Sequence, residues 1–173
     1  MKKFKFISVF IVCLMLVSNA WAKKTVEKIG DYMQVIVPAY AFGMAMNEED
    51  WVGAKQFAYS FATMEASVYG LKYLVKERRP NKADNRSFPS GHTAAAVSGA
   101  AFIHGRYGIK RAVVPYLMSG FTAYSRIVAN KHYWWDTLAG ATIAGLISYS
   151  FVDKYNNTCV TASPEYIGIK TRF

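Results

Sequence analysis

Apolar residues recur along most of the chain at the spacing of α-helices, and short polar or glycine-containing turns interrupt the runs. This pattern predicts five helices after the N-terminal segment. They cover residues 31–46, 52–78, 92–107, 111–126 and 133–152. Because there is no convincing alternating strand, repeat or low-complexity tract, we expect an all-α fold: an antiparallel helical bundle of five to six helices.

The first 22 residues have the organisation of a bacterial export signal. Met1–Lys5 is basic, an apolar stretch follows, and Ala20-Trp21-Ala22 offers a small-residue cleavage site. We interpret residues 1–22 as a signal peptide, or as a signal anchor that adds the sixth helix if it is retained. Cleavage would leave 173 − 22 = 151 residues, enough for one domain. We expect that domain at residues 23–152 and a polar tail at 153–173, lying as a loop across the bundle.

The charge balance favours an anionic partner. The chain has 21 Lys and Arg against 11 Asp and Glu, and loss of the three leader lysines would leave 18 − 11 = +7. Such a charge suits an anionic substrate or an acidic lipid surface, and no motif indicates a nucleic-acid partner. Cys13 and Cys159 cannot pair after processing, and no His, Cys or carboxylate cluster has metal-ligand spacing. We therefore expect no metal and no cofactor.

Whether the bundle crosses a membrane stays open at this point. Uncharged runs such as Tyr32–Asn47 and Thr137–Val152 are 16 residues long, short of the roughly 20 residues that a comfortable span needs. The mean hydropathy of +0.08 is low for a polytopic protein. Small residues at 99–101 and 139–145 are typical of closely packed membrane helices, although soluble bundles also use them.

His132 and Asp136 are four residues apart at the predicted start of the last helix. On one helical face, the carboxylate accepts a proton from one imidazole nitrogen and leaves the other free as a nucleophile. The alternative is an ordinary polar pair at a helix start. A third histidine, His104, is interpreted as structural.

Ser90, Gly91 and His92 read as the start of another helix. Ser90 is a good N-cap, and the unpaired N–H groups of the first turn favour an anion in front of them. His92 in that turn is placed to protonate a departing oxygen and then to deprotonate water. The alternative is a simple capping turn before an alanine-rich packing helix.

Lys72 and Arg79 are seven residues apart, so in one helix both would project from the same face about 10 Å apart. Pro80 predicts that this helix ends near Arg79. Arg126 adds a planar fork for bidentate phosphate contact, whereas Lys72 acts as a point charge. In an antiparallel bundle, all these groups fall at helix ends on the same side, which predicts one active site at one end of the bundle.

Three blocks of these residues resemble the signature of the type 2 phosphatidic acid phosphatase family, which shares its fold with the vanadium haloperoxidases. The blocks are Lys72-x6-Arg79-Pro80, Pro89-Ser90-Gly91-His92 and Ser125-Arg126-x5-His132-x3-Asp136. The resemblance implies a phosphohistidine intermediate on His132, oriented by Asp136, with His92 as general acid and then base. It also implies phosphate binding by Lys72, Arg79, Ser90, Gly91 and Arg126.

The resemblance also narrows the substrate. The eight-residue gap between Pro80 and Pro89, and the stretch around it, look more like the lipid-phosphatase branch than the secreted acid phosphatases. Tyr133, Trp134 and Trp135 are expected either at a lipid headgroup interface or in the core.

We therefore expect a bacterial enzyme of the inner membrane whose site faces the periplasm. Its partner is a phosphorylated lipid, such as a polyprenyl diphosphate, a lipid A phosphate or a phosphatidyl phosphate, at a membrane surface or in the bilayer. The alternatives are a soluble periplasmic acid phosphatase acting on a small phosphate ester, a vanadium haloperoxidase, and a non-catalytic phospholipid-binding protein. The sequence predicts no particular oligomeric state.

Overall fold

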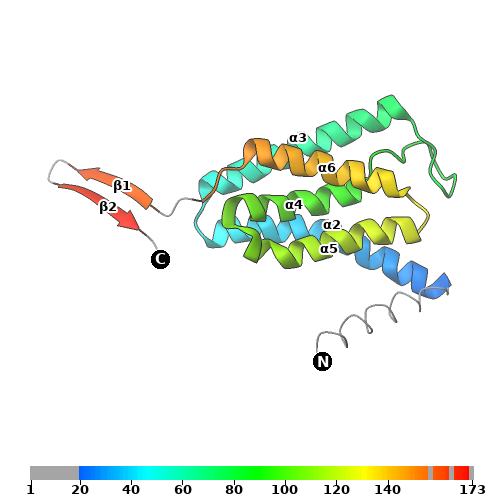
Figure 1. Ribbon diagram of the computed structural model, residues 1–173, viewed down its shortest axis with the longest axis horizontal. Helices are drawn as coiled ribbons and strands as arrows, with labels where there is room; N and C mark the ends of the chain where they lie inside the picture. Colours follow the sequence, from blue (N-terminus) through cyan, green and yellow to red (C-terminus); the bar gives the residue numbers. More distant parts are fainter. Residues whose placement is uncertain (1–19, 156–157, 164–165, 172–173) are drawn as a thin grey trace.

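A computed structural model describes residues 20–155, 158–163 and 166–171, so most of the expected leader lies outside the described residues. Five helices form an antiparallel bundle, which confirms the predicted all-α fold (Figure 1). They are α2 (Ala20–Asn47), α3 (Trp51–Val75), α4 (Gly91–Tyr107), α5 (Ile109–Val128) and α6 (Trp134–Phe151).

Two boundaries differ from the sequence prediction. Helix α2 begins at Ala20 rather than at residue 31, because the Ala-, Lys- and Glu-containing stretch before Asp31 is itself helix-forming. Helix α3 ends at Val75 rather than at residue 78, because Lys76 adopts a left-handed conformation with φ of 50°. The second difference places Arg79, a predicted site residue, in the loop after α3.

The C-terminal tail is a hairpin, so the prediction of a loop across the bundle is wrong. Strands β1 (Thr158–Ser163) and β2 (Tyr166–Thr171) pair antiparallel, with Thr158 opposite Thr171 and Ser163 opposite Tyr166. Figure 1 shows this hairpin pointing away from the helices. Threonine and valine in β1 and isoleucine and threonine in β2 favour extended backbone, which outweighs the polar character of the tail.

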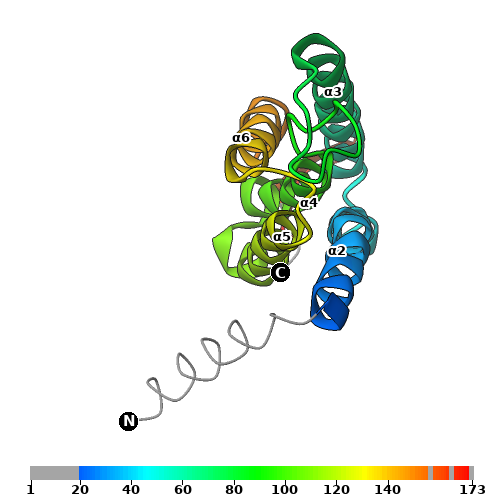
Figure 2. The same cartoon turned by 90° about the vertical axis from the view of Figure 1, so that its right-hand side faces the viewer.

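Helix α4 is the centre of the bundle and packs against all four other helices (Figure 2). Its small residues permit close contact: a Cβ on Gly99 would lie 2.8 Å from the carbonyl oxygen of Val37 on α2. Phe102 of α4 and Phe57 of α3 are buried with ring centroids 4.9 Å apart. The central position of α4 fixes where its first turn, which carries His92, sits in the bundle.

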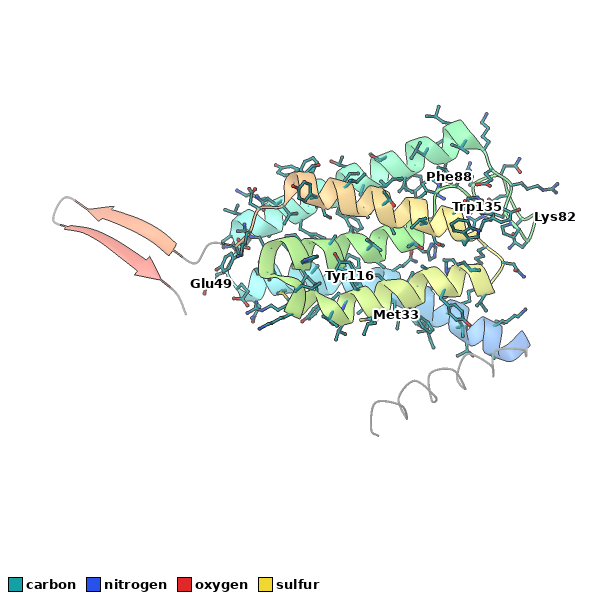
Figure 3. The ribbon with its side chains drawn as sticks, in the orientation of Figure 1. Met33, Glu49, Lys82, Phe88, Tyr116 and Trp135 are labelled. Atoms are coloured by element: carbon teal, nitrogen blue, oxygen red, sulfur yellow. The ribbon has the colours of Figure 1, made fainter. Side chains whose placement is uncertain are left out.

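A buried ion pair closes the end of the bundle opposite the predicted site. Asp50 accepts two hydrogen bonds of 2.7 Å from Arg106, one from the hydroxyl of Tyr107 and one from the N–H of Gly53. These contacts hold the α2–α3 turn to the end of α4 and hold the pKa of Asp50 below its usual value, although burial opposes them. In Figure 3, Glu49 marks this end, while Lys82, Phe88 and Trp135 mark the other.

The outer surface of the bundle is unusually apolar. Leu74, Leu117, Leu146 and Tyr149 are 79%, 69%, 63% and 87% exposed, and further aromatic and aliphatic side chains surround them. Within the described residues, no helix has both the length and the apolar character that crossing a bilayer requires.

Candidate active site

The three sequence blocks meet at one end of the bundle, around a cavity of about 320 Å³. The first block lies at the end of α3 and in the loop after it, the second begins α4, and the third spans the α5–α6 turn. Five of the predicted site residues line this cavity: Lys72, Arg79, Gly91, His92 and His132.

Lys72 and Arg79 reach the cavity by different routes, so the prediction that they share a helical face is wrong. Lys72 is in the last turn of α3, whereas Arg79 lies in the loop beyond the left-handed Lys76. Arg79 is held there by Asp84, whose Oδ1 accepts from Nε at 2.8 Å and whose backbone oxygen accepts from the Arg79 N–H. The loop therefore folds back to bring the guanidinium to the cavity.

Lys72 connects α3 to the turn that precedes α4. Its Nζ donates to the carbonyl oxygens of Arg86 at 3.0 Å and Pro89 at 2.5 Å. Burial, and to a lesser extent the charge of Arg79, lowers the pKa of Lys72 to about 8. The ammonium is thus charged at neutral pH and loses that charge in mildly alkaline solution.

Helix α4 begins as the sequence predicts, with Ser90 as N-cap. The Ser90 hydroxyl is fully buried and lies 3.1 Å from that of Thr93, so its side chain does not line the cavity. Its backbone N–H donates to the carbonyl oxygen of Asp136 at 2.9 Å. A Cβ on Gly140 would lie 2.5 Å from the carbonyl oxygen of Ser90, so glycine is required for this approach of α6 to α4.

His132 and Asp136 are adjacent and buried at the start of α6. Nδ1 of His132 lies 3.5 Å from Oδ2 of Asp136, and neither Nδ1 nor Oδ1 of Asp136 has a hydrogen-bond partner within the part of the chain that the structure describes. Oδ2 accepts from the Ser87 hydroxyl at 2.5 Å and from the Tyr133 N–H at 2.9 Å. The carboxylate beside the imidazole is therefore fixed in place by two other donors.

Burial works against charge on both partners of this pair. It lowers the pKa of His132, although the contact with Asp136 opposes that effect. Burial alone would raise the pKa of Asp136, but its contacts with His132, Ser87 and Tyr133 hold that pKa below the usual value. The pair is thus a neutral imidazole beside an ionised carboxylate, the state in which a ring nitrogen is nucleophilic.

His92 and Arg126 share a carboxylate that the sequence motifs do not contain. Oδ1 of Asp31, on α2, lies 3.1 Å from Nε2 of His92 and 2.7 Å from Nη1 of Arg126. Arg126 is fully buried behind the cavity, and its Nη2 donates to the carbonyl oxygen of Glu27 at 2.6 Å. Burial, together with the charge of Arg126, lowers the pKa of His92 to about 4, with Asp31 opposing.

Several polar residues at the site were not predicted from the sequence: Asp31 and Ser87 contact predicted site residues, and Gln34, Glu65, Asp84 and Arg86 line the cavity. Asp31 is the only acidic residue between Glu27 and Glu48, and this isolation was the available signal. Ser87 stands two residues before the second block, with no spacing that links it to Asp136. Trp134 and Trp135 are 61% and 39% exposed, which excludes the core alternative for them.

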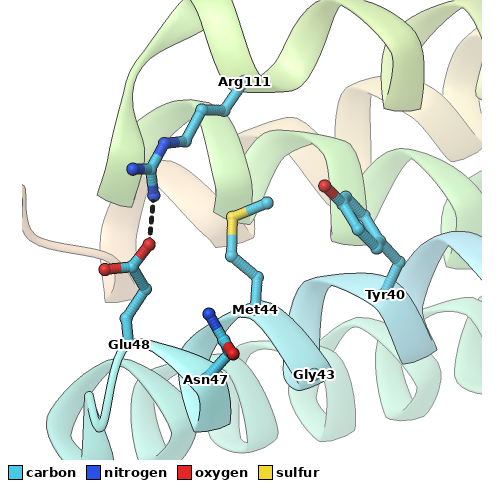
Figure 4. Close-up of a pocket in the computed structure, with 6 residues that line it drawn as sticks. All are labelled: Tyr40, Gly43, Met44, Asn47, Glu48 and Arg111. Atoms are coloured by element: carbon cyan, nitrogen blue, oxygen red, sulfur yellow. Dashed lines mark hydrogen bonds and ion pairs between the residues drawn. The ribbon is translucent and has the colours of Figure 1, made fainter.

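A second cavity, of about 420 Å³, lies near the opposite end of the bundle between α2 and α5 (Figure 4). Arg111 donates to Glu48 at 2.6 Å across it, and Tyr40 and Met44 form its apolar wall. None of the predicted phosphate-site residues lines this second cavity.

Two imidazoles and three cations, Lys72, Arg79 and Arg86, line one cavity of a helical bundle, which fits a phosphoric ester hydrolase. The chain belongs to the PAP2 superfamily, whose sequence model matches residues 8–158. The recognised resemblance and the predicted enzyme class are thereby confirmed.

Three relatives are informative. A lipid A 4'-phosphatase of Helicobacter pylori is 29% identical over 140 residues, which cover 75% of this chain and 70% of that protein. A lipid A 1-phosphatase of Porphyromonas gingivalis is 38% identical over 93 residues, 52% of this chain and 21% of that much longer protein. The crystal structure of Aquifex aeolicus LpxE superposes with a TM-score of 0.65 at 18% identity, covering 83% of this chain and 92% of that one. This last likeness supports the fold alone.

Proposed function

We propose that this protein hydrolyses a phosphate monoester or diphosphate on a membrane lipid through a phosphohistidine intermediate on His132, without a metal or cofactor. The observation that carries the proposal is the pairing of buried His132 with Asp136 in the wall of a cavity that also contains His92 and Lys72. A nucleophile, a proton carrier and a cation for the phosphate oxygens are the parts that phosphoryl transfer needs.

In the first step, Nε2 of His132 attacks phosphorus while Asp136 holds the opposite side of the ring. The bond from phosphorus to the lipid oxygen breaks, and His92 gives its proton to that oxygen. Because the pKa of His92 is near 4 in the unliganded site, the negative charge of the bound phosphate has to raise this pKa for the proton to be present at neutral pH.

In the second step, water attacks the phosphorus of phosphohistidine and passes a proton to His92. The N–P bond breaks, inorganic phosphate leaves, and His132 returns to its neutral state. Lys72, Arg79 and the N–H groups at Gly91 bind the phosphate oxygens from the cavity wall. Arg126 acts from behind the wall, and Ser90 contributes by fixing the first turn of α4.

A membrane lipid is the proposed carrier of the phosphate for two reasons. The curated relatives named above are lipid A phosphatases, so a lipid A phosphate is the first substrate to test. The apolar outer surface and the exposed Trp134 and Trp135 beside the nucleophile suit a bilayer and its headgroups. The basic chain and its export-like leader suit association with the inner membrane and a site that faces the periplasm.

The test is phosphate release from lipid A, undecaprenyl diphosphate, phosphatidate and a soluble phosphate ester, in the presence of EDTA. We expect release from at least one lipid, and His132→Ala to lower it by about 10³-fold or more. His104→Ala is the matched control, because His104 lies in the last turn of α4 beside Tyr116 and does not line the cavity. A phosphoenzyme trapped in the wild type and absent from His132→Ala supports the mechanism. Undiminished release by His132→Ala, or activity only on the soluble ester, contradicts the proposal.

A further inference from the structure

An apolar groove of about 570 Å³ lies between α2 and α3, and Ala95 of α4 contributes to its lining. This size lies within the range of about 300–1,000 Å³ that is usual for small-molecule sites. Apart from its polar mouth, its lining is hydrocarbon and aromatic. The main lining residues are Val35, Pro38, Ala39, Phe42, Phe57 and Phe61.

This groove adjoins the catalytic cavity, because Gln34, Glu65 and Tyr69 line both. On one side of these three residues lie the two histidines with Lys72 and Arg79, and on the other side the lining is apolar. A molecule that occupies both sides must therefore have an anionic end and a hydrocarbon end. A small soluble ester would leave the groove empty.

The junction between the two parts is polar. Gln34 and Glu65 are half-buried, and their amide and carboxylate make no hydrogen bond to any residue in the described ranges. Burial raises the pKa of Glu65, while the charge of Lys72 opposes that rise. These oxygens can accept hydrogen bonds from O–H or N–H donors in the part of a ligand between its phosphate and its hydrocarbon chain.

We propose that the groove binds an acyl chain of the lipid whose phosphate occupies the catalytic cavity, and that Gln34 and Glu65 select a linker that carries hydroxyl or amide donors. This inference rests on the proposed lipid phosphatase function. An acylated sugar phosphate supplies such donors beside its phosphate. A polyprenyl phosphate has none before its hydrocarbon chain begins, so the junction favours a phosphorylated saccharolipid.

The groove is tested with one variant that fills it and one that places a charge in its apolar lining. Ala39→Phe and Val35→Glu both change exposed positions of α2, so the variants are expected to fold. Gly43→Phe is the matched control, one turn further along α2, because Gly43 lines the other cavity and a Cβ there meets nothing within 4 Å. The measured quantity is the kcat/KM for a long-chain N-acylated glucosamine 1-phosphate divided by that for N-acetylglucosamine 1-phosphate.

We expect this ratio to fall about tenfold or more in Ala39→Phe and Val35→Glu and to keep its wild-type value in Gly43→Phe. A ratio that does not change in the two groove variants overturns the groove assignment while the phosphatase function stands. A wild-type protein that releases phosphate from neither sugar phosphate nor any lipid overturns the proposed function, and the inference fails with it.

The junction is tested with Glu65→Met, which removes both acceptor oxygens at similar length. The readout is kcat/KM for the N-acylated glucosamine phosphate relative to farnesyl phosphate. We expect this ratio to fall about tenfold or more because the sugar donors lose a hydrogen-bond acceptor. Any change in the charge of Lys72 affects both substrates through their shared phosphate and leaves the ratio unmoved. An unchanged ratio contradicts the role of Glu65.

Discussion

Ser87 offers a direct test of how Asp136 holds His132. The Ser87 hydroxyl donates to Oδ2 of Asp136 at 2.5 Å, and both residues are fully buried. Ser87→Ala removes this donor while leaving the Tyr133 N–H in place. Because serine and alanine differ by one oxygen atom, the substitution changes the hydrogen bonding of the carboxylate far more than the packing around it.

The expected size follows from the charge on the acceptor. A hydrogen bond to an ionised group contributes about 1.5–3 kcal/mol, and a loss of that size in the transition state corresponds to a fall of roughly 10- to 150-fold in kcat. The variant also weakens the stabilisation of the ionised carboxylate, so the pKa of Asp136 rises. The acid limb of the pH–rate profile therefore moves to higher pH, because Asp136 has to be ionised to orient His132.

The assay measures kcat, KM and the pH–rate profile with a phosphate ester that the wild type hydrolyses. Ser98→Ala is the matched control, since Ser98 is a buried serine of α4 whose hydroxyl donates to the Ala95 carbonyl oxygen at 2.8 Å, away from the cavity. We expect Ser98→Ala to change stability without moving the acid limb. A folded Ser87→Ala protein with wild-type kcat and an unmoved acid limb would refute the reasoning.

Three further predictions concern charge and packing. Inorganic phosphate should inhibit the wild type less as pH rises from 7 to 9, because Lys72 loses its charge above its pKa of about 8. The Lys72→Arg variant should largely retain this inhibition at pH 9. An equal loss of inhibition in the wild type and the variant would contradict the assignment to Lys72. Gly140→Ala should lower the free energy of unfolding by about 1–3 kcal/mol and also lower kcat, because its Cβ meets the Ser90 carbonyl oxygen at 2.5 Å; wild-type values of both would show that the helices move apart freely. Asp50→Ala should cost about 3–5 kcal/mol in urea unfolding by leaving Arg106 buried and unpaired, while the folded fraction keeps its kcat; loss of kcat in folded protein would mean that the two ends are coupled.

The sequence was sufficient to predict that the three blocks lie at one end of the bundle. It did not predict which backbone conformation brings each residue to the cavity. The blocks stand beside turns on alternate connections, and an antiparallel order brings those turns to one end. The prediction that Lys72 and Arg79 share a helical face was wrong, because residues 76–78 continue the sequence pattern of a helix although α3 ends at Val75. A single left-handed residue, Lys76, ends α3 early, and lysine carries no signal for positive φ.

The partners of the motif residues were beyond sequence reasoning for a different reason. Asp31 contacts Arg126 across 95 positions of sequence, because α2 packs against α5. Ser87 reaches Asp136 across 49 positions. Such pairs depend on how whole helices dock. The prediction of a loop for the tail was wrong for a local reason, because the polar composition of the tail was given more weight than its β-branched residues.

The carboxylate of Asp31 already occupies contacts with Arg126 and His92 that a bound phosphate could otherwise make. Arg126 is already desolvated and already neutralised, with Asp31 as its counter-ion and Nε2 of His92 beside the same oxygen. An incoming phosphate that uses these groups therefore exchanges with a resident anion instead of filling an unopposed positive charge. Displacing Asp31 would cost free energy for any phosphate that uses Arg126 and His92, the inorganic product included. The affinity of this cavity for a phosphate would then depend on a residue of α2, the helix that also forms one wall of the groove.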